Sequence, residues 1–350
     1  METVYTLEPG SYLRKDGESL KVLKDKTVID QIPAAHLKKL VLAGYVSLSG
    51  SVLDFLIKNR VETVFITPTG RFRARLMIDE HKHVKLRQQQ YINLSEPMFA
   101  QRVMRCLVAR KITNMTRFCR ARGADYKNER LTAAAAQLKM FEAKLSEASA
   151  ADTIRGMEGA ATRIYYSVFG EMIRNSDFSF NGRNRRPPRD PVNALLSFVY
   201  TLLTNEVLSA IKVCGLDPYM GSLHEIAYGR PSLACDLVEE YRCHLGDRFV
   251  LGLINRRMIQ PGDFVYRRLE KDPEAMVDEQ EMKESRPVEM KPETSKTLIA
   301  AYEAMMARRF YYKPDDSRIT YRQLIHHQAR RFADFLIDPE AVYQPFIPEK

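Results

Sequence analysis

One change of periodicity constrains the fold of this chain more than any other feature. In the first part of the chain, turn residues alternate with short apolar runs, such as the Asp-Gly turn in Tyr12–Gly17 followed by Ser19–Leu23, a pattern typical of β-hairpins. From about Glu96 onward, apolar residues recur at helical spacing. The sequence therefore predicts an α+β protein with a small β-rich N-terminal domain over residues 1–85 and a larger all-α C-terminal domain over residues 86–350.

Turn and cap signals divide each domain further. In the N-terminal part, Ser51–Asn59 has helical spacing and lies among strand candidates. The strand candidates are Lys39–Gly44, Val46–Ser49 and Thr63–Thr67. In the C-terminal part, breaks at Gly, Pro or Asn separate the expected helices. These helices are Phe99–Arg120, Leu131–Leu145, Ala150–Ile173, Pro191–Lys212, Pro231–Leu245, Thr297–Phe310 and Tyr321–Ile337. Met276–Lys296 is charged and poor in apolar residues, which favours an exposed connection.

Composition narrows the class of partner and the compartment. With 350 residues, 45% of them hydrophobic, the chain is long enough for about two domains. Its net charge of +10 and pI near 9.3 favour a polyanionic partner, DNA or RNA, over an acidic small molecule. The five cysteines show no CxxC spacing, which favours reduced thiols in a cytoplasmic protein. The first residues lack a signal-peptide pattern, and the longest apolar run, Ala194–Thr204, is too short to span a bilayer. We therefore expect a soluble protein that does not associate with membranes.

One stretch of the C-terminal part carries most of the candidate chemistry. His224 lies at the edge of a Gly-Arg-Pro loop, and the helix expected after it presents Asp236, Glu239 and Glu240 on adjoining faces, because residues three and four apart are helical neighbours. Upstream, Glu158 supplies another acid among small residues. An imidazole combined with carboxylates suits a divalent ion such as Mn²⁺ or Mg²⁺. Such a site is more typical of phosphoryl transfer than of redox chemistry.

Several motifs follow one another in order through this part of the chain. They are Gly156–Ala161, Asn181–Pro188, Asp190–Tyr200, Gly215–Pro218, Gly221–His224, Gly229–Leu233 and Asp236–Arg242. In this order they resemble the CRISPR adaptation integrase family, the Cas-one endonucleases. The resemblance extends over nearly the whole chain, since Leu13–Gly70 is similar to the N-terminal domain of that family and the residues from Tyr321 onward to its closing helices.

The resemblance implies a metal-dependent DNA endonuclease and integrase that inserts spacer DNA into a CRISPR array. It assigns Mg²⁺ or Mn²⁺ to Glu158, His224 and Glu239, with Asp236 as a supporting acid. The last ligand of the family is commonly aspartate, one methylene shorter than Glu239, and Glu240 stays open as a substitute. The implied partners are double-stranded DNA of the protospacer and the CRISPR repeat, a second copy of the chain joined through the N-terminal domains, and a dimer of the small adaptation protein Cas-two.

Basic and aromatic residues near these motifs are candidates for DNA contact. Guanidinium groups crowded on one short loop repel one another unless an anion lies near, so we expect the loop after residue 181 to contact phosphate. Its arginines are Arg183, Arg185, Arg186 and Arg189. Arg230, close to His224, is a candidate for a phosphate contact or for pairing with a site carboxylate. Tyr165 falls on almost the same helical stripe as Glu158, where it could stack on a base or pack in the core.

Integration chemistry agrees with this set of residues. A DNA 3′-hydroxyl attacks a phosphodiester and displaces another 3′-oxygen, so the enzyme must offset phosphoryl charge and align the attack. A divalent ion helps with both tasks, and the sequence shows no convincing Ser/His/Asp constellation. Two other functions stay open at this point. One is a general metal-dependent nuclease for branched or repair DNA, with water as the nucleophile, and the other is a catalytically silent DNA-binding scaffold.

Overall fold

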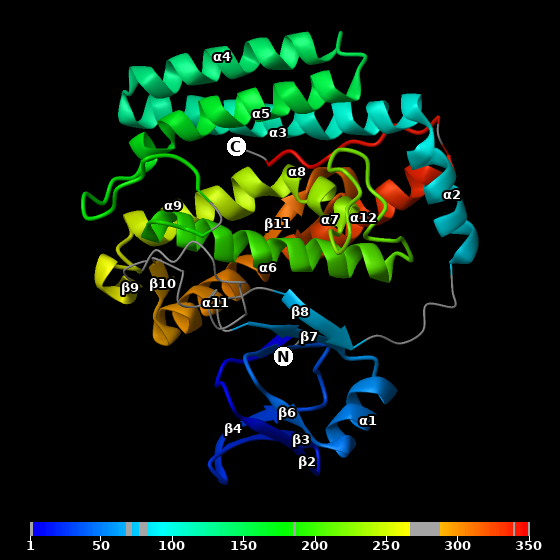
Figure 1. The fold of residues 1–350 in the computed structure, drawn as a ribbon, viewed down its shortest axis with the longest axis vertical. Helices are drawn as coiled ribbons and strands as arrows, with labels where there is room; N and C mark the ends of the chain where they lie inside the picture. Colours follow the sequence, from blue (N-terminus) through cyan, green and yellow to red (C-terminus); the bar gives the residue numbers. More distant parts are fainter. Residues whose placement is uncertain are drawn as a thin grey trace, which may run out of the picture. The chain divides into compact units, whose positions relative to one another are not determined.

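The computed structural model describes residues 3–67, 72–76, 83–184, 187–266, 288–338 and 340–348. The chain divides into two compact units. The first comprises Met1–Glu80 with Pro292–Thr297, and the second comprises His81–Lys291 with Leu298–Lys350. Figure 1 shows strands gathered in the first unit and mostly helices in the second. The predicted α+β class, with a β-rich N-terminal part and a larger helical part, is confirmed.

The described strands of the N-terminal unit form two sheets that pack with one helix. The elements are β1 (Thr3–Thr6), β2 (Tyr12–Asp16), β3 (Ser19–Lys24), β4 (Thr27–Pro33), β5 (Lys39–Ala43), β6 (Ser47–Leu48), α1 (Gly50–Lys58), β7 (Glu62–Ile66) and β8 (Phe72–Leu76). One sheet has the order β1-β5-β7-β8, parallel except for the β7–β8 pair. The other has the order β4-β3-β2-β6, antiparallel except for the β2–β6 pair.

Leucines and valines on one face of these strands form the core of the N-terminal unit. Leu13 of β2 and Val22 of β3 are register partners and are both buried, and Leu56 of α1 packs in the same cluster. The predicted hairpin is confirmed, because β2 and β3 meet at an Asp-Gly turn. Gly17 of this turn has φ of +54°, a left-handed conformation that glycine adopts without steric cost.

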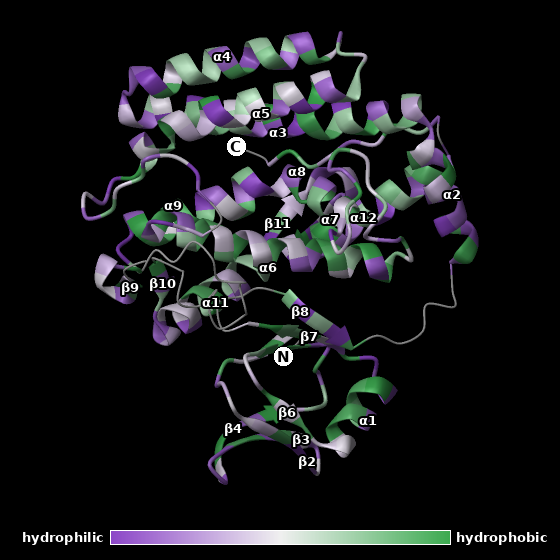
Figure 2. Cartoon of the chain, viewed as in Figure 1, coloured by the Kyte–Doolittle hydropathy of each residue, from purple (hydrophilic) through white to green (hydrophobic). Residues whose placement is uncertain are grey.

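Helices α3 (Pro97–Tyr126), α4 (Glu129–Leu145) and α5 (Ala151–Val168) lie side by side as one layer of the C-terminal unit (Figure 1). Short connections make consecutive helices antiparallel neighbours. Glu96 caps α3 by accepting hydrogen bonds from the backbone of Met98 and Phe99. Figure 2 shows hydrophilic and hydrophobic residues alternating along α4, as expected for a helix with one solvent-exposed face.

Helix α6 (Pro191–Val213) is the central helix of the same unit. Asp190 caps it by accepting a hydrogen bond from Asn193 N, and Pro191 occupies its first turn. By length and composition α6 could cross a membrane, but 83% of its most apolar window is buried inside the protein. It is therefore weak evidence for a membrane span, since the core helix of a soluble protein passes the same test.

The single helix predicted over Pro231–Leu245 is wrong, because the backbone changes type along it. The chain forms α7 (Ser232–Leu237), α8 (Glu239–Tyr241), a π-helical turn (Arg242–Asp247) and α9 (Arg248–Asn255). A π turn is wider than an α turn and occurs frequently at functional sites. Gly246 lets this wide turn approach α6, because a Cβ there would lie 2.7 Å from Tyr200 Cε1.

The remaining elements belong to the C-terminal unit, except for Pro292–Thr297, and include several that the sequence did not indicate. They are α2 (Val84–Ser95), the 3₁₀ turns η1 (Phe169–Met172), η3 (Pro261–Asp263) and η4 (Lys313–Asp315), β9 (Phe264–Tyr266), β10 (Val288–Met290), α11 (Pro292–Met306), β11 (Arg309–Tyr312), β12 (Ser317–Thr320) and α12 (Tyr321–Ile337). An exposed connection is predicted over Met276–Lys296, and its residues 276–287 lie outside the described ranges. For residues 288–296 the prediction is wrong, because they form β10 and the start of α11.

Candidate active site

The loop before α7 holds His224 by its backbone and by its ring. Asp236, fully buried on α7, accepts hydrogen bonds through Oδ2 from the backbone N–H groups of Ser222 (2.6 Å) and Leu223 (2.9 Å). Its Oδ1 accepts from His224 N at 2.8 Å and also lies 2.8 Å from His224 Nδ1. A carboxylate at Nδ1 makes that nitrogen the donor and leaves the Nε2 lone pair free to bind a metal. Gly221 permits this approach, because a Cβ there would lie 2.6 Å from Asp236 Oδ2.

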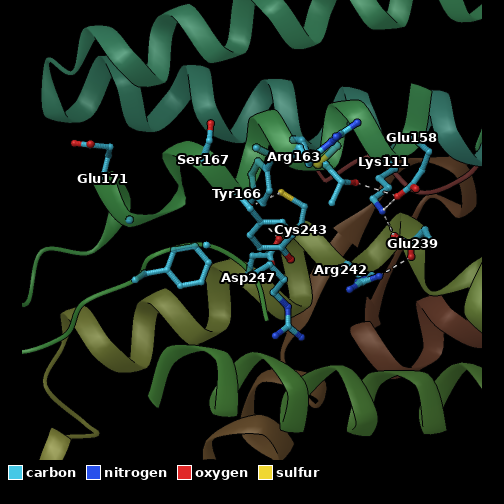
Figure 3. Close-up of a pocket in the computed structure, with 18 of the residues that line it drawn as sticks. Lys111, Glu158, Arg163, Tyr166, Ser167, Glu171, Glu239, Arg242, Cys243 and Asp247 are labelled. Atoms are coloured by element: carbon cyan, nitrogen blue, oxygen red, sulfur yellow. Dashed lines mark hydrogen bonds and ion pairs between the residues drawn. The ribbon is translucent and has the colours of Figure 1, made fainter. Parts of the chain in front are cut away.

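Two more helices bring carboxylates to the same place. Glu158 projects from α5 and Glu239 from α8, and Lys111 of α3 lies between them (Figure 3). The Lys111 Nζ atom forms an ion pair with Glu158 Oε1 and lies 2.8 Å from Glu239 Oε2. The other oxygen of Glu239, Oε1, lies 4.0 Å from His224 Nε2. The structure thus gathers Glu158, His224 and Glu239 around one lysine, although they come from three separate segments.

Glu239 is an anion held in a buried position. Its side chain is only 2% exposed, and its Oε1 accepts a hydrogen bond from Arg242 at 2.6 Å. Burial alone would raise the pKa of Glu239, but the charges of Arg242, Lys111 and His224 lower it below its usual range. The Arg242 guanidinium in turn lies 4.2 Å from the centre of the Tyr200 ring, so its position is fixed by both contacts. The carboxylate is therefore charged at neutral pH and directed at the cluster.

Glu240 points away from this cluster and anchors the C-terminal segment. It is fully buried and accepts hydrogen bonds from Tyr343 Oη (2.8 Å), Gln328 Nε2 (3.1 Å) and Phe346 N (2.5 Å). Burial raises its pKa. The structure therefore does not bring Glu240 together with Glu158 and His224, and its carboxylate is engaged by donors of the C-terminal segment and α12.

A cavity of about 900 Å³ opens beside the cluster. Lys111, Glu158, His224 and Glu239 form part of its wall. Its other basic and aromatic wall residues include Arg130, Arg163, Tyr166, Phe180, Arg183 and Arg242. Glu171 and Asp247 also line the cavity. A wall that combines carboxylates with several guanidinium groups suits a substrate that carries phosphate and meets a cation.

The comparison with known proteins starts from the protein family. The model of the family described as CRISPR associated protein Cas1 matches residues 4–304. The chain belongs to the Cas1 family. A relative, CRISPR-associated endonuclease Cas1 1 of Chlorobaculum tepidum, is 35% identical over 99% of this chain and 98% of its own length. CRISPR-associated endonuclease Cas1 3 of Thermus thermophilus is 34% identical over 98% of this chain and 96% of its own length.

Solved structures share the fold of this Cas1 chain. A Cas1 protein from Thermotoga maritima superimposes with a TM-score of 0.78 at 24% identity, covering 100% of both chains. A casposase bound to an integration product gives a TM-score of 0.83 at 20% identity, over 100% of this chain and 94% of that one. A chain of a Cas6-RT-Cas1–Cas2 complex gives 0.81 at 22% identity, over 99% of this chain and 36% of that one.

The metal ligands predicted for this Cas1 chain lie near one another, but they are not arranged around one position that a metal ion could occupy. Within the described ranges, no group of three His, Cys, Asp or Glu side chains is placed so as to hold a metal ion. The Lys111 ammonium separates the two carboxylates. The donor types nevertheless fit a hard or borderline divalent ion, which prefers carboxylate oxygen and accepts imidazole nitrogen. Glu239 Oε2 is also buried without a hydrogen bond of normal geometry, although it forms an ion pair with Lys111, so a cation suits it.

Tyr165 of this Cas1 chain lies in the core. Its side chain is 1% exposed, and its hydroxyl donates a hydrogen bond to Asp247 at 2.9 Å. The Tyr200 hydroxyl donates to the same carboxylate, and burial raises the pKa of Asp247. This placement favours a packing role for Tyr165 over a stacking contact with a DNA base.

Arg183 belongs to the cavity wall and is fixed by neighbours in its own loop and in α6. It donates hydrogen bonds to Asn193 Oδ1 (2.7 Å) and Ser197 Oγ (3.1 Å), and its guanidinium lies 5.4 Å from the centre of the Tyr200 ring. Arg183 is therefore positioned by the protein itself before any DNA binds.

The other predicted DNA contacts are placed differently. Arg189 is exposed, while Arg185 and Arg186 lie outside the described residues. Arg230 is also exposed and donates a hydrogen bond to the carbonyl of Glu225 at 3.3 Å. It is not paired with a site carboxylate among the described contacts. Both exposed arginines are accessible to a phosphate backbone.

From the sequence, Lys111 is one of several basic residues spread around its helix, of which only part can face DNA, and it was not placed at the candidate site. The signal is visible in retrospect, because Lys111 shares the apolar stripe of α3 with Val108 and Met115, which are both buried. Lysine is almost never fully buried unless it is paired. A lysine at such a position therefore indicates a buried anion nearby.

Arg155 was missed as well, and only the structure reveals its contact. It lies on α5 one turn before Glu158, and its Nε donates a hydrogen bond to the carbonyl of Leu223 at 2.9 Å. The helix that carries Glu158 therefore also fixes the loop that carries His224.

Proposed function

We propose that this chain is a metal-dependent DNA endonuclease and integrase that inserts spacer DNA into a CRISPR array. One observation carries the proposal: in a member of the Cas1 family, Glu158, His224 and Glu239 meet in the wall of a cavity rich in guanidinium groups. The relatives are named endonucleases, and the casposase with this fold is bound to an integration product. The names of the relatives support the endonuclease activity, and the casposase structure supports the integrase activity.

In the proposed reaction, a DNA 3′-hydroxyl attacks the phosphorus of a phosphodiester in the target. A new P–O bond forms as the attacking hydroxyl gives up its proton to solvent. The bond to the leaving 3′-oxygen breaks, and that oxygen takes up a proton from solvent to become a free 3′-hydroxyl. When bound, Mg²⁺ or Mn²⁺ is held by Glu158, His224 and Glu239 and supplies Lewis-acid stabilisation of phosphoryl charge. The protein residues align the reacting groups and balance the charge of the ligands.

The alignment falls to residues that hold the ligands. Asp236 determines which His224 nitrogen faces the site, because it engages Nδ1. Arg242 fixes one oxygen of Glu239 and balances its charge. Guanidinium groups of the cavity wall, such as Arg163 and Arg183, attract the phosphate backbone independently of base sequence.

We also propose the partners that this function requires. The DNA is double-stranded, from the protospacer and the CRISPR repeat, and the exposed Arg189 and Arg230 contact its phosphates together with Arg185 and Arg186. Residues 1–85 join two copies of the chain, and residues 86–350 carry the site. A partner of the Cas2 type completes the assembly, as supported by the Cas6-RT-Cas1–Cas2 complex that shares the fold.

An integration assay tests this function. The purified chain, a Cas2-type partner, a supercoiled repeat-bearing plasmid and a short duplex are mixed with Mg²⁺, Mn²⁺ or chelator. We expect joined products with either metal and none with chelator or with Glu158→Gln. Glu171→Gln is the matched control, since Glu171 lies in the same cavity wall, away from Glu158 (Figure 3). Cut but unjoined DNA would indicate a general nuclease. A wild-type yield of joined product with Glu158→Gln would show that the chemistry does not need this carboxylate, as expected if the chain is a catalytically silent scaffold.

A further inference from the structure

Lys111 is a buried cation that already holds the centre of the proposed site. It is 7% exposed, although lysine is among the residues least often buried. Its ammonium pairs with Glu158 Oε1 and lies 2.8 Å from Glu239 Oε2. Both carboxylates that the proposed function assigns to a metal are therefore engaged by one internal charge.

A divalent ion and the Lys111 ammonium cannot occupy this point together. A metal would bind the two carboxylates that the ammonium already engages, and two cations held at the same pair of carboxylates repel each other strongly in a partly buried site. Together with Arg242, the Lys111 ammonium offsets the burial of the Glu239 carboxylate, since a buried carboxylate needs a compensating charge. Lys111 thus satisfies the site in the absence of metal and competes with metal for it.

The cavity offers the displaced side chain a place to go. Lys111 itself lines the cavity of about 900 Å³ together with Thr162 and Tyr166, so rotation of its flexible stem moves the ammonium into open space. There it faces the region that the proposed function assigns to the DNA phosphates. A lysine is suited to this move, because its charge is a point on a stem of freely rotating bonds.

We propose that Lys111 is a positioning residue that keeps Glu158 and Glu239 together before metal binds and is displaced into the cavity by the metal. The proposal rests on the proposed function, because it requires that these carboxylates are metal ligands. It predicts that the lysine weakens metal binding while it stabilises the metal-free protein. A lysine that only stabilised the fold would leave metal affinity unchanged.

Titration of Mn²⁺ followed by electron paramagnetic resonance tests the competition. We expect Lys111→Met to bind Mn²⁺ at least tenfold more tightly than the wild type, which corresponds to about 1.4 kcal/mol. In chelator, Lys111→Met should melt at a lower temperature than the wild type. At saturating Mn²⁺ this difference in melting temperature should disappear. Lys139→Met, at an exposed position on α4, removes the same charge and should change neither quantity. Equal or weaker Mn²⁺ binding by Lys111→Met would overturn the proposal.

Lysine labelling of the wild-type chain gives a second readout that does not depend on folding of the variant. With an amine-reactive reagent and mass spectrometry, Lys111 should be protected in chelator and become labelled when Mg²⁺ is added. Unchanged protection at saturating metal would overturn displacement. Glu158→Gln separates the two proposals: if it binds Mn²⁺ as the wild type does, the ligand assignment is wrong and the role of Lys111 fails with it. If only the Lys111 results are negative, the proposed function stands.

Discussion

Replacing Asp236 with asparagine should disable the site through His224 while it preserves size and shape. Asp236 Oδ2 accepts hydrogen bonds from Ser222 and Leu223, and Oδ1 accepts from His224 N and faces its Nδ1. In asparagine one of these oxygens becomes an NH₂ group, which cannot accept. With NH₂ at the Oδ1 position, the amide donates to Nδ1 and favours the tautomer that carries its proton on Nε2, so the lone pair needed for a metal is lost.

The cost of the change can be estimated from these contacts. With NH₂ at the Oδ2 position the amide loses the hydrogen bonds from Ser222 N and Leu223 N. With NH₂ at the Oδ1 position it loses the bond from His224 N and replaces the charged contact at Nδ1 with a neutral one. A hydrogen bond to a buried charged group contributes about 1.5–3 kcal/mol. Because the loop can relax toward solvent, we expect the two affected contacts to cost near the lower end of this range each, about 3 kcal/mol together in the free energy of unfolding. For metal affinity or activity, changes of this kind to a residue that orients a ligand cost about 10–100-fold.

Mn²⁺ titration and strand-transfer yield measure the functional effect, and chemical denaturation measures the stability. Asp125→Asn is the control, since Asp125 is exposed near the end of α3 and pairs only with Arg122 among the described contacts. It should leave all three quantities unchanged. Wild-type Mn²⁺ affinity and joining in Asp236→Asn would refute the reasoning, because the orientation of His224 would then not depend on Asp236.

Three further predictions follow from single contacts. Glu240→Ala should lower the free energy of unfolding by about 3 kcal/mol, because it removes the acceptor of buried donors on Tyr343, Gln328 and Phe346. Its Mn²⁺ affinity should equal that of the wild type, and a loss of Mn²⁺ binding would indicate that Glu240 is a ligand. Arg189→Ala with Arg230→Ala should reduce the slope of log DNA affinity against log salt by up to about 2, and an unchanged slope would exclude phosphate contacts by this pair. Burial, followed by the charges of Arg248 and Arg308, lowers the pKa of His244 to about 4 from about 6.5 when unfolded, so the unfolded chain takes up the proton first as pH falls. Up to about 3 kcal/mol of stability is then lost between pH 6.5 and pH 4, and His244→Gln should flatten this loss in denaturation curves; an equally steep loss in the variant would contradict the assignment.

The organisation of the chain into a β-rich part and a helical part was predictable from the sequence. Hairpin turns and helical spacing are local properties, determined by residues that are close neighbours in the chain. The Asp-Gly turn before Ser19 and the caps of α3 and α6 are examples, because the capping side chain and the backbone it bonds are within three residues. The exceptions were elements such as α2 and the β11–β12 pair, which the sequence analysis did not identify.

The backbone of the segment after Pro231 shows where local reasoning fails. Its spacing indicates one continuous helix, yet the chain widens into a π turn at Arg242–Asp247. The widening depends on contacts with residues far away in sequence, such as the approach of Gly246 to Tyr200. Tertiary packing therefore decided the backbone type here, and with it the direction of the side chains that follow Glu239.

The residue types of the candidate site were also readable from the sequence, since an imidazole and acids in ordered motifs suit one class of chemistry. The sequence could not distinguish the roles of Glu239 and Glu240, because adjacent helical residues differ only in direction. Packing decided it: Glu239 faces Lys111, whereas Glu240 faces the C-terminal segment, over one hundred positions away. In the same way, Lys111 meets Glu158 across 47 positions. Such pairs arise only when separate helices pack against one another, and no local pattern in the chain records which helices those are.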